Sequence, residues 1–197
     1  MPVASFLGPF QDVTNAPVAG EASAAAVPTS GRSKHLPVSM EQPVPTKWCW
    51  AATTAGICSF YAELRGLGTV LSACQVATNC LYVSCCPEPT DPNDPRNREY
   101  ALQGALDMVG RLASCTQGVL NFDKISQEID ADRPICCHIA WDASNPDNGH
   151  FNAIIGYDAD NGDVDICDCI GNQTLPYQTF LTAYRGSGRW DWTYQTN

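Results

Sequence analysis

The chain has 197 residues, a size that fits one domain or two small lobes that share a cleft. It carries 21 acidic against 11 basic side chains, and the formal net charge of -10 argues against binding to the phosphates of nucleic acids. Charged residues are only 16% and hydrophobic residues 44% of the chain, so we expect a folded protein. The sequence lacks an apolar stretch of ~18–20 residues, which a membrane helix would need.

The chain contains eleven cysteines, an odd number, so at most ten can pair with one another. Many cysteines favour an oxidising compartment, and we therefore expect a secreted or exported protein, although the start MPVASFLGPF has no positively charged region of a signal peptide. Structural disulfides, up to five, are the default expectation for the cysteine set. A redox relay or a metal store is the alternative, but the spacing is not that of two cysteine pairs in a zinc finger.

Residues 1–40 lack hydrophobic periodicity and are rich in Ala, Ser, Pro, Val and Gly, as in EASAAAVPTSGRS. This composition is typical of linkers, so we expect a flexible leader over 1–40 and one folded domain over 41–197. The linker-like stretch VPTSGR suggests that the leader is a propeptide or export segment removed in maturation, with self-cleavage as one route.

Residues 41–115 are expected to form a helical lobe. Thr46 can cap a helix over about 47–64, in which small residues alternate with large apolar ones and leave little polar face, as in a buried central helix. Further helices are predicted over 72–77, capped by its serine, and over about 98–109, ended by a glycine. The stretch CCPEPTDPNDPRN between them holds four prolines and predicts an ordered or disulfide-tied loop.

Residues 116–197 are expected to form a β lobe, which carries twelve acidic and four basic side chains. Asp123 can cap a short helix that Pro134 ends. The pair Asn161-Gly162 is a strong hairpin signal, so neighbouring strands are expected to be antiparallel. The whole chain therefore predicts an α+β fold with a helical lobe packed on an antiparallel β lobe. The predicted strands cover 135–141, 150–157, 163–168 and 189–194.

Three places in the sequence carry side chains suited to nucleophilic catalysis. Cys49 lies at the start of the predicted central helix, where the positive end of the helix dipole favours a thiolate. His150 lies at the start of a strand, from which its imidazole can face the thiolate across a cleft. Asp168 follows the hairpin, and antiparallel pairing can return it beside His150, where it would orient the ring.

These residues resemble those of the papain-like cysteine proteases. The resemblance rests on the run WCWAA from Trp48 to Ala52, on Arg133-Pro134-Ile135 before a strand, on Gly149-His150-Phe151 with Ile155-Gly156-Tyr157, and on an Asp eighteen residues after the His. It covers roughly residues 41–195 in order. Among papain-like proteases, the chain is most similar to the bacterial avirulence-effector type, which is related in fold to the staphopains.

The resemblance implies a papain-like fold with the active site between the two lobes, and it implies a role for each site residue. Cys49 would be the nucleophile, His150 the general base and acid, and Asp168 the residue that orients the histidine. Gln42 would be the oxyanion-hole side chain beside the backbone N–H of Cys49. The implied activity is a cysteine endopeptidase that acts through a thioester acyl-enzyme, and this chemistry needs no metal or organic cofactor.

Other features of the sequence compete with this assignment. Asp165 is the rival for the third role, but its odd separation from Asp168 places the two on opposite faces of a strand. His138, inside an apolar strand, and His35, in the leader, are expected to be structural. The stretch 158–163 faintly resembles a calcium loop but lacks its ligands at later positions, so a hairpin turn is favoured. The alternating aromatic stripe of 190–194 is expected to pack in the core rather than bind sugar.

Two other functions stay open from the sequence. One is an acyl transferase of the same fold, a transglutaminase or peptide cyclase, in which an amine replaces water. The other is a binding module on a catalytically dead papain scaffold. We expect a monomer that acts on a protein or peptide substrate, without nucleic-acid or membrane partners, and the acidic β lobe favours basic residues near the cleft.

Overall fold

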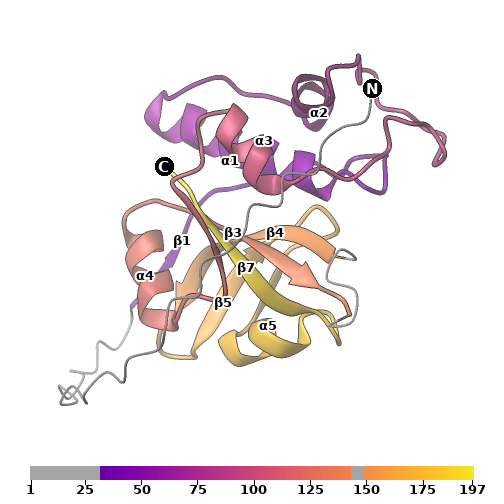
Figure 1. Ribbon diagram of the computed structural model, residues 1–197. Coiled ribbons are helices and arrows are strands. Elements are labelled where there is room, and N and C mark those ends of the chain that lie inside the picture. Colours follow the sequence, from indigo (N-terminus) through magenta and orange to yellow (C-terminus); the bar gives the residue numbers. More distant parts are fainter. Residues whose placement is uncertain (1–31, 143–148) are drawn as a thin grey trace, which may run out of the picture.

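The computed structural model describes residues 32–142 and 149–197. This part of the chain forms five helices and seven strands, with three consecutive helices in its first half and four consecutive strands in its second (Figure 1). The helices are α1 (Cys49–Arg65), α2 (Ala73–Leu81), α3 (Leu102–Met108), α4 (Phe122–Asp130) and α5 (Tyr177–Ala183). The strands are β1 (Ser33–His35), β2 (Ser114–Gln117), β3 (Ile135–Ala140), β4 (Gly149–Asp158), β5 (Asp163–Cys167), β6 (Gln173–Pro176) and β7 (Arg189–Gln195).

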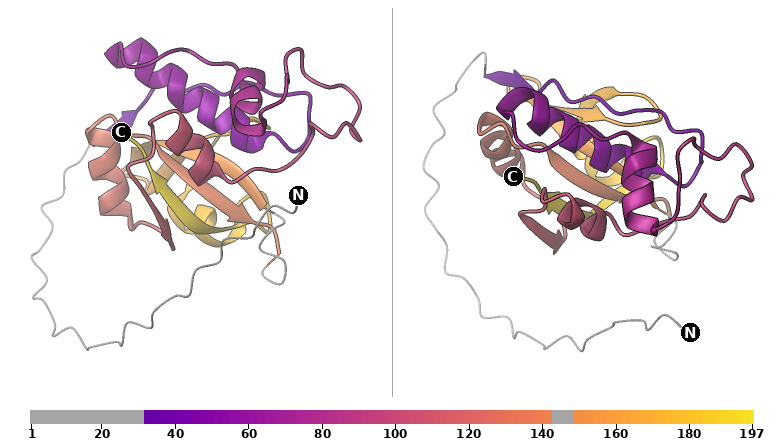
Figure 2. Two further views of the ribbon diagram at one scale, coloured as in Figure 1. Left: turned by 45° about the horizontal axis from the view of Figure 1, so that its top comes forward. Right: turned by 90° about the horizontal axis from the view of Figure 1, so that it is seen from above.

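The strands form one antiparallel sheet in the order β2-β7-β3-β4-β5-β6, and β1 pairs with β4. Helices α1, α2 and α3 lie together on one side of this sheet, and α5 lies on the other (Figure 1). The view from above in Figure 2 shows α1 running across the sheet, which it contacts along β4. The predicted α+β fold, with a helical lobe packed on an antiparallel β lobe, is confirmed.

Helix α1 is the central helix that the sequence predicts, because every residue from Trp50 to Cys58 is buried. The predicted cap at Thr46 is wrong, since the helix begins at Cys49 and no side chain caps its first turn. The chain before the helix is instead held by Asn97, whose Oδ1 accepts from Lys47 N at 3.0 Å and whose Nδ2 donates to Thr46 Oγ1 at 3.3 Å. A loop residue therefore fixes the entry to α1.

The other helix starts follow the expected chemistry with one correction. Ser72 caps α2 in a capping box with Gln75, as the sequence suggests, although the helix continues past Ala77. The residue that caps α4 is Asn121, whose side chain accepts from Lys124 N, and Asp123 lies inside the first turn. An acidic side chain there still interacts favourably with the positive end of the helix.

The leader boundary predicted at residue 40 falls too late. Strand β1 pairs with β4, and both Leu36 and Val38 are buried, so the folded domain begins by Ser33. The composition signal failed because three paired residues are too few to produce a strand pattern. Residues 1–31, which make up most of the predicted leader, lie outside the described residues.

The predicted strands over 135–141, 150–157, 163–168 and 189–194 all form, with ends that shift by a residue or two. The Asn161-Gly162 turn joins β4 to β5, and Gly162 adopts a φ of 71°, which only glycine reaches without strain. Asp158 accepts hydrogen bonds from the backbone N–H groups of Asp160 and Asn161, so its carboxylate closes the turn. No helix in the described part of the chain is long and apolar enough to cross a membrane.

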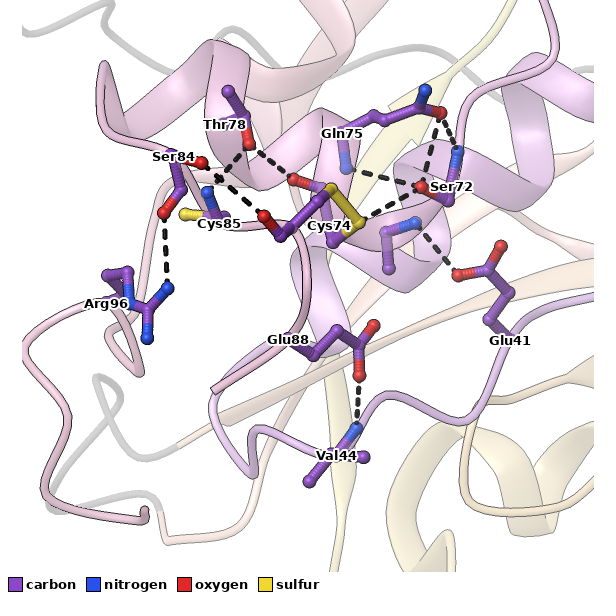
Figure 3. Close-up of a disulfide and its surroundings, with 12 residues drawn as sticks. Glu41, Val44, Ser72, Cys74, Gln75, Thr78, Ser84, Cys85, Glu88 and Arg96 are labelled. Carbon is purple, nitrogen blue, oxygen red and sulfur yellow. Dashed lines mark hydrogen bonds between the residues drawn. A yellow bond between two sulfur atoms is a disulfide. The ribbon is translucent and has the colours of Figure 1, made fainter. Parts of the chain in front are cut away.

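A proline-rich loop between α2 and α3 is tied to the helical lobe by a disulfide, as predicted for this stretch. Cys86 in the loop bonds to Cys74 in the first turn of α2, and Val44 N donates to Glu88 Oε2 at 2.8 Å (Figure 3). Further along the loop, Arg96 donates to the backbone oxygen of Ser84. The loop is therefore ordered by both covalent and polar contacts.

The remaining nine cysteines, all within the described residues, are free, so the structure holds one disulfide where up to five were expected. Geometry explains the difference. Cys136 and Cys167, for example, flank Ala153 from opposite sides in the sheet, two strand spacings or about 10 Å apart. A disulfide needs Cα atoms within about 7 Å, so these buried thiols cannot pair without breaking the sheet.

Candidate active site

Cys49 is the first residue of α1, and its side chain is half-buried in the wall of a cleft. Its neighbours anchor it: Trp48 and Trp50 are fully buried, and their indole N–H groups donate to the backbone oxygens of Arg96 and Arg98 at 2.9 and 3.2 Å. Backbone N–H groups in the first turn of a helix have no intrahelical acceptor. The thiol therefore faces the positive end of a firmly held helix.

His150 and Asp168 come together from two neighbouring antiparallel strands, as the sequence predicts. His150 is the second residue of β4, and Asp168 follows directly after β5. His150 Nε2 lies 2.8 Å from Asp168 Oδ1, and the Asp168 side chain is fully buried. Cys49 lies close enough to this imidazole to contribute to raising its pKa. Because Asp168 takes Nε2, the ring nitrogen that remains for Cys49 is Nδ1.

The groups around His150 favour a charged imidazole. Burial by itself lowers the pKa of His150, but the hydrogen bonds and charges of Asp168 and Cys49 outweigh it and raise that pKa to about 9. Burial would raise the pKa of Asp168, but His150, the backbone N–H of Ile170 and the Tyr184 hydroxyl hold it below the usual range. The pair is therefore an imidazolium and a carboxylate at neutral pH.

Two aromatic residues that sequence reasoning did not find complete the surroundings of the pair. The buried Tyr184 donates its hydroxyl to Asp168 Oδ2, the oxygen that His150 does not use. Trp141 stacks on His150 with ring centroids 5.9 Å apart, and on Tyr184 at 6.3 Å. These rings keep water from the His150–Asp168 hydrogen bond. Neither residue lies in a recognisable motif, so only the fold brings them to the site.

Gln42 is not brought to the other three residues. It is exposed and is absent from the described residues that line the cleft. Seven positions and two prolines separate it from Cys49, and Val44 between them is held by Glu88 of the neighbouring loop. The oxyanion-hole role of Gln42 therefore stays a prediction, while the backbone N–H of Cys49 is in place.

Asp165, the rival for the third role, faces away from the cleft. Its carboxylate lies 2.9 Å from His35 Nδ1 and accepts from the Thr174 hydroxyl. His35 is therefore a partner in a structural pair between β1 and β5. The opposite orientations of Asp165 and Asp168 agree with the alternation expected along a strand.

The cleft has a volume of about 1040 Å³ and runs between the two lobes. Its helical side includes Lys47, Cys49, Trp50, Glu99 and Tyr100. Its sheet side includes His138, His150, Phe151, Asp191 and Trp192. Two expectations change here: His138 and Trp192, assigned to the structural core by the sequence pattern, instead reach the cleft.

One group of side chains near the triad has the composition of a metal site. Ligand atoms of His150, Asp168 and Cys169 lie within 4.8 Å of one another. Burial is the main cause that raises the pKa of the Cys169 thiol to about 12, so it is protonated at neutral pH. A metal ion at this point would have to replace the proton between His150 and Asp168. The hydrogen bond between His150 and Asp168 therefore argues against a metal ion between these two residues.

A family model described as the Peptidase_C39 like family matches residues 34–192. The chain belongs to the Peptidase_C39 like family. The matched range begins in β1 and ends in β7, so it includes Cys49, His150 and Asp168. None of the curated proteins compared with the chain matches it.

Solved structures show the same fold at low sequence identity. The crystal structure of a C39-like peptidase from Bacillus anthracis is 14% identical, with a TM-score of 0.54 over 83% of this chain and 97% of the other. Xylellain, a cysteine protease from Xylella fastidiosa, is 12% identical, with a TM-score of 0.52 over 88% of each chain. Family and fold together support a cysteine peptidase. They do not single out the avirulence-effector type of the sequence comparison.

Proposed function

We propose that the protein is a cysteine endopeptidase that cleaves protein or peptide substrates with a triad of Cys49, His150 and Asp168. The observation that carries the proposal is the 2.8 Å hydrogen bond between His150 and Asp168 in a cleft that Cys49 and His150 both line. Nucleophile, base and orienting carboxylate in this order are the requirement for acyl transfer through a covalent intermediate.

In the proposed reaction, His150 holds the proton of Cys49, and the thiolate attacks the carbonyl carbon of the scissile peptide bond. The backbone N–H of Cys49 donates to the oxygen that becomes negative, and Gln42 is the proposed second donor. His150 then gives its proton to the leaving amine as the carbon–nitrogen bond breaks. Water, deprotonated by the same imidazole, hydrolyses the thioester and restores the thiol.

The test is to incubate the purified protein, its Cys49→Ala variant and its His150→Ala variant with unfolded casein and a fluorogenic peptide library. We expect cleavage by the wild type and loss of at least about 1000-fold in both variants, because residues of a triad act as one unit. Alkylation by iodoacetamide followed by peptide mapping gives a separate readout of Cys49. Near-wild-type turnover by His150→Ala would refute the assignment.

The same assay separates the two other functions that the sequence left open. With an added primary amine, a hydrolase releases mostly the free carboxylate, whereas an acyl transferase releases the amide, and mass spectrometry distinguishes the two products. A dead scaffold would leave Cys49 unalkylated at neutral pH. Because Cys49 is free and half-buried in the cleft, we expect alkylation.

Export and removal of the leader are part of the same proposal. The linker-like composition of residues 1–31 and the start of the folded domain at β1 support a processing site before Ser33. Mass spectrometry of the wild type beside Cys49→Ala gives the N-terminus of each. An identical N-terminus in both would exclude self-cleavage.

A further inference from the structure

Strand β7 contains an irregularity at the edge of the cleft. His138 of β3 pairs with Trp192 of β7, but the next residue, Ile139, pairs with Trp190, so Asp191 is an extra residue in β7. A β-bulge of this kind changes the direction of a side chain. Trp190 stays buried, at 3% exposure, whereas Asp191 and Trp192 both line the cleft.

Asp191 is held in this position by two further contacts. Its Oδ1 lies 2.7 Å from Nδ1 of His138, and its backbone oxygen accepts from Gly118 N at 2.7 Å. The side chain is 29% exposed, so the carboxylate is positioned by the sheet and still open to the cleft. An acidic side chain with a fixed backbone and a fixed oxygen is suited to orient a ligand.

The pair lies directly beside the proposed general base. The imidazole of His138 covers Gly149 so closely that a Cβ at position 149 would collide with its Nε2. On the other side, its ring centroid lies 5.0 Å from that of Phe151. His138, Asp191 and His150 line the same cleft, so a substrate that reaches His150 also passes this pair.

Among the described residues of the sheet side of the cleft, Asp191 is the acidic group. On the helical side, Lys47 Nζ and Glu99 Oε1 are 3.4 Å apart, so their charges largely offset each other. Asp191 contacts the His138 imidazole through Oδ1 only, which leaves its second carboxylate oxygen for a ligand. Phe151 and Trp192 supply aromatic walls, against which the stem and cationic head of arginine pack well.

We propose that Asp191, oriented by His138, is a cation-binding subsite that selects substrates with arginine or lysine near the scissile bond. The proposal rests on the proposed peptidase activity and adds the substrate class to it. The aliphatic stem of the basic residue would lie along Trp192, and its head group would pair with the free oxygen of the Asp191 carboxylate. No bond is made or broken at this subsite.

The chain offers a matched control for the test. Asp165 and His35 form a second histidine–aspartate pair at 2.9 Å on the same sheet, but Asp165 faces away from the cleft. The peptides carry arginine, lysine, norleucine or glutamate at each of the four positions before the cleaved bond. Each is assayed at pH 8 with the wild type, Asp191→Asn, Asp191→Arg and Asp165→Asn.

We expect the wild type to prefer arginine and lysine over norleucine and glutamate at one of these positions. Asp191→Asn should lower kcat/KM for the arginine peptide by roughly 10- to 100-fold, the effect of losing a charged hydrogen bond, with the norleucine peptide nearly unchanged. Asp191→Arg should shift the preference toward glutamate. Asp165→Asn should behave as the wild type. Equal losses on all peptides, or no basic preference in the wild type, would overturn the subsite.

A second measurement separates this proposal from the proposed function. Peptidyl chloromethyl ketones with arginine or norleucine at the selected position alkylate Cys49 without peptide hydrolysis, and mass spectrometry gives both rates. Faster alkylation by the arginine reagent in the wild type but not in Asp191→Asn supports the subsite even if no peptide is cleaved. If the arginine and norleucine reagents alkylate Cys49 with the same ratio of rates in the wild type and in Asp191→Asn, the subsite is overturned. Cleavage of the peptides would then still support the peptidase assignment.

Discussion

Replacing Asp168 by asparagine should change the pH dependence of the enzyme more than its activity at low pH. Asparagine keeps the size of the side chain but removes the charge that faces His150 Nε2 at 2.8 Å. That interaction contributes to raising the pKa of His150 from 6.5 to about 9. Burial lowers this pKa and Cys49 still raises it, so without Asp168 we expect it to fall toward the ordinary value near 6.5, by about 2.5 units at most.

The size of the effect follows from the two pKa values. A difference of about 2.5 pH units corresponds to about 3 kcal/mol of imidazolium stabilisation. At pH 8 an imidazole with a pKa near 9 is about 90% protonated, whereas one with a pKa near 6.5 is about 3% protonated, a loss of about 30-fold. At pH 6 both forms are mostly protonated, so the same loss is less than twofold. Any loss from misorientation of the ring adds equally at both pH values.

The assay is kcat/KM for one peptide between pH 5 and 10, with wild type, Asp168→Asn and the control Asp165→Asn. The basic limb of the bell-shaped profile belongs to the Cys49–His150 pair and should move down by about two units in Asp168→Asn only. Circular dichroism at pH 6 and 8 checks that the variant stays folded. A basic limb that stays near pH 9 would show that Asp168 does not set the charge of the imidazole.

Three further predictions concern stability. Tyr184→Phe removes a donor to the buried Asp168 and should cost about 1–3 kcal/mol in denaturant unfolding at pH 7. Since that hydroxyl lowers the pKa of Asp168, the cost should shrink only below about pH 4, and a cost independent of pH would contradict this link. Asn97→Ala removes the amide that holds the chain before α1 and should lower stability by about 1–2 kcal/mol, with Asn93→Ala, on the same loop, as the control. Burial raises the pKa of the Cys58 and Cys167 thiols to about 11, whereas the same thiols ionise near pH 8.5 in the unfolded chain. Under reducing conditions the free energy of unfolding should therefore fall as the pH rises from about 8.5 to 11. A urea midpoint that stays constant over this range would refute the prediction.

The sequence was sufficient to predict the parts of the fold that repeat a local signal. The buried faces of α1 and β4, the Asn161-Gly162 turn and the helix cap at Ser72 all depend on residues within a few positions of one another. Short elements such as β1, β2 and β6 were missed because three or four residues carry too little pattern. Their position depends on the strands that they pair with.

The site residues that belong to a sequence motif could be predicted. Those that reach the site only through tertiary packing could not. Cys49, His150 and Asp168 could be named because each lies at a helix or strand end with a characteristic neighbourhood. The odd number of cysteines did not by itself identify Cys49, since nine thiols are free. Burial and position together distinguish them: seven are buried, Cys49 and Cys115 are half-buried, and of these two Cys49 lines the cleft. Tyr184 and Asp191 were missed because their roles depend on a long-range contact and on a bulge.

The bulge in β7 also separates the residues that pack in the core from the residue that sets the charge of the cleft. Trp190 and Tyr194 pack in the core, so changes there would be costly to the fold. Asp191 is the extra residue and has no backbone partner in the β3 register, so its side chain can change without disturbing the ladder. The cleft can therefore acquire a different charge at position 191 during evolution while the core and the triad stay the same. Among relatives of this chain, we expect residue 191 to vary more freely than the core residues Trp190 and Tyr194.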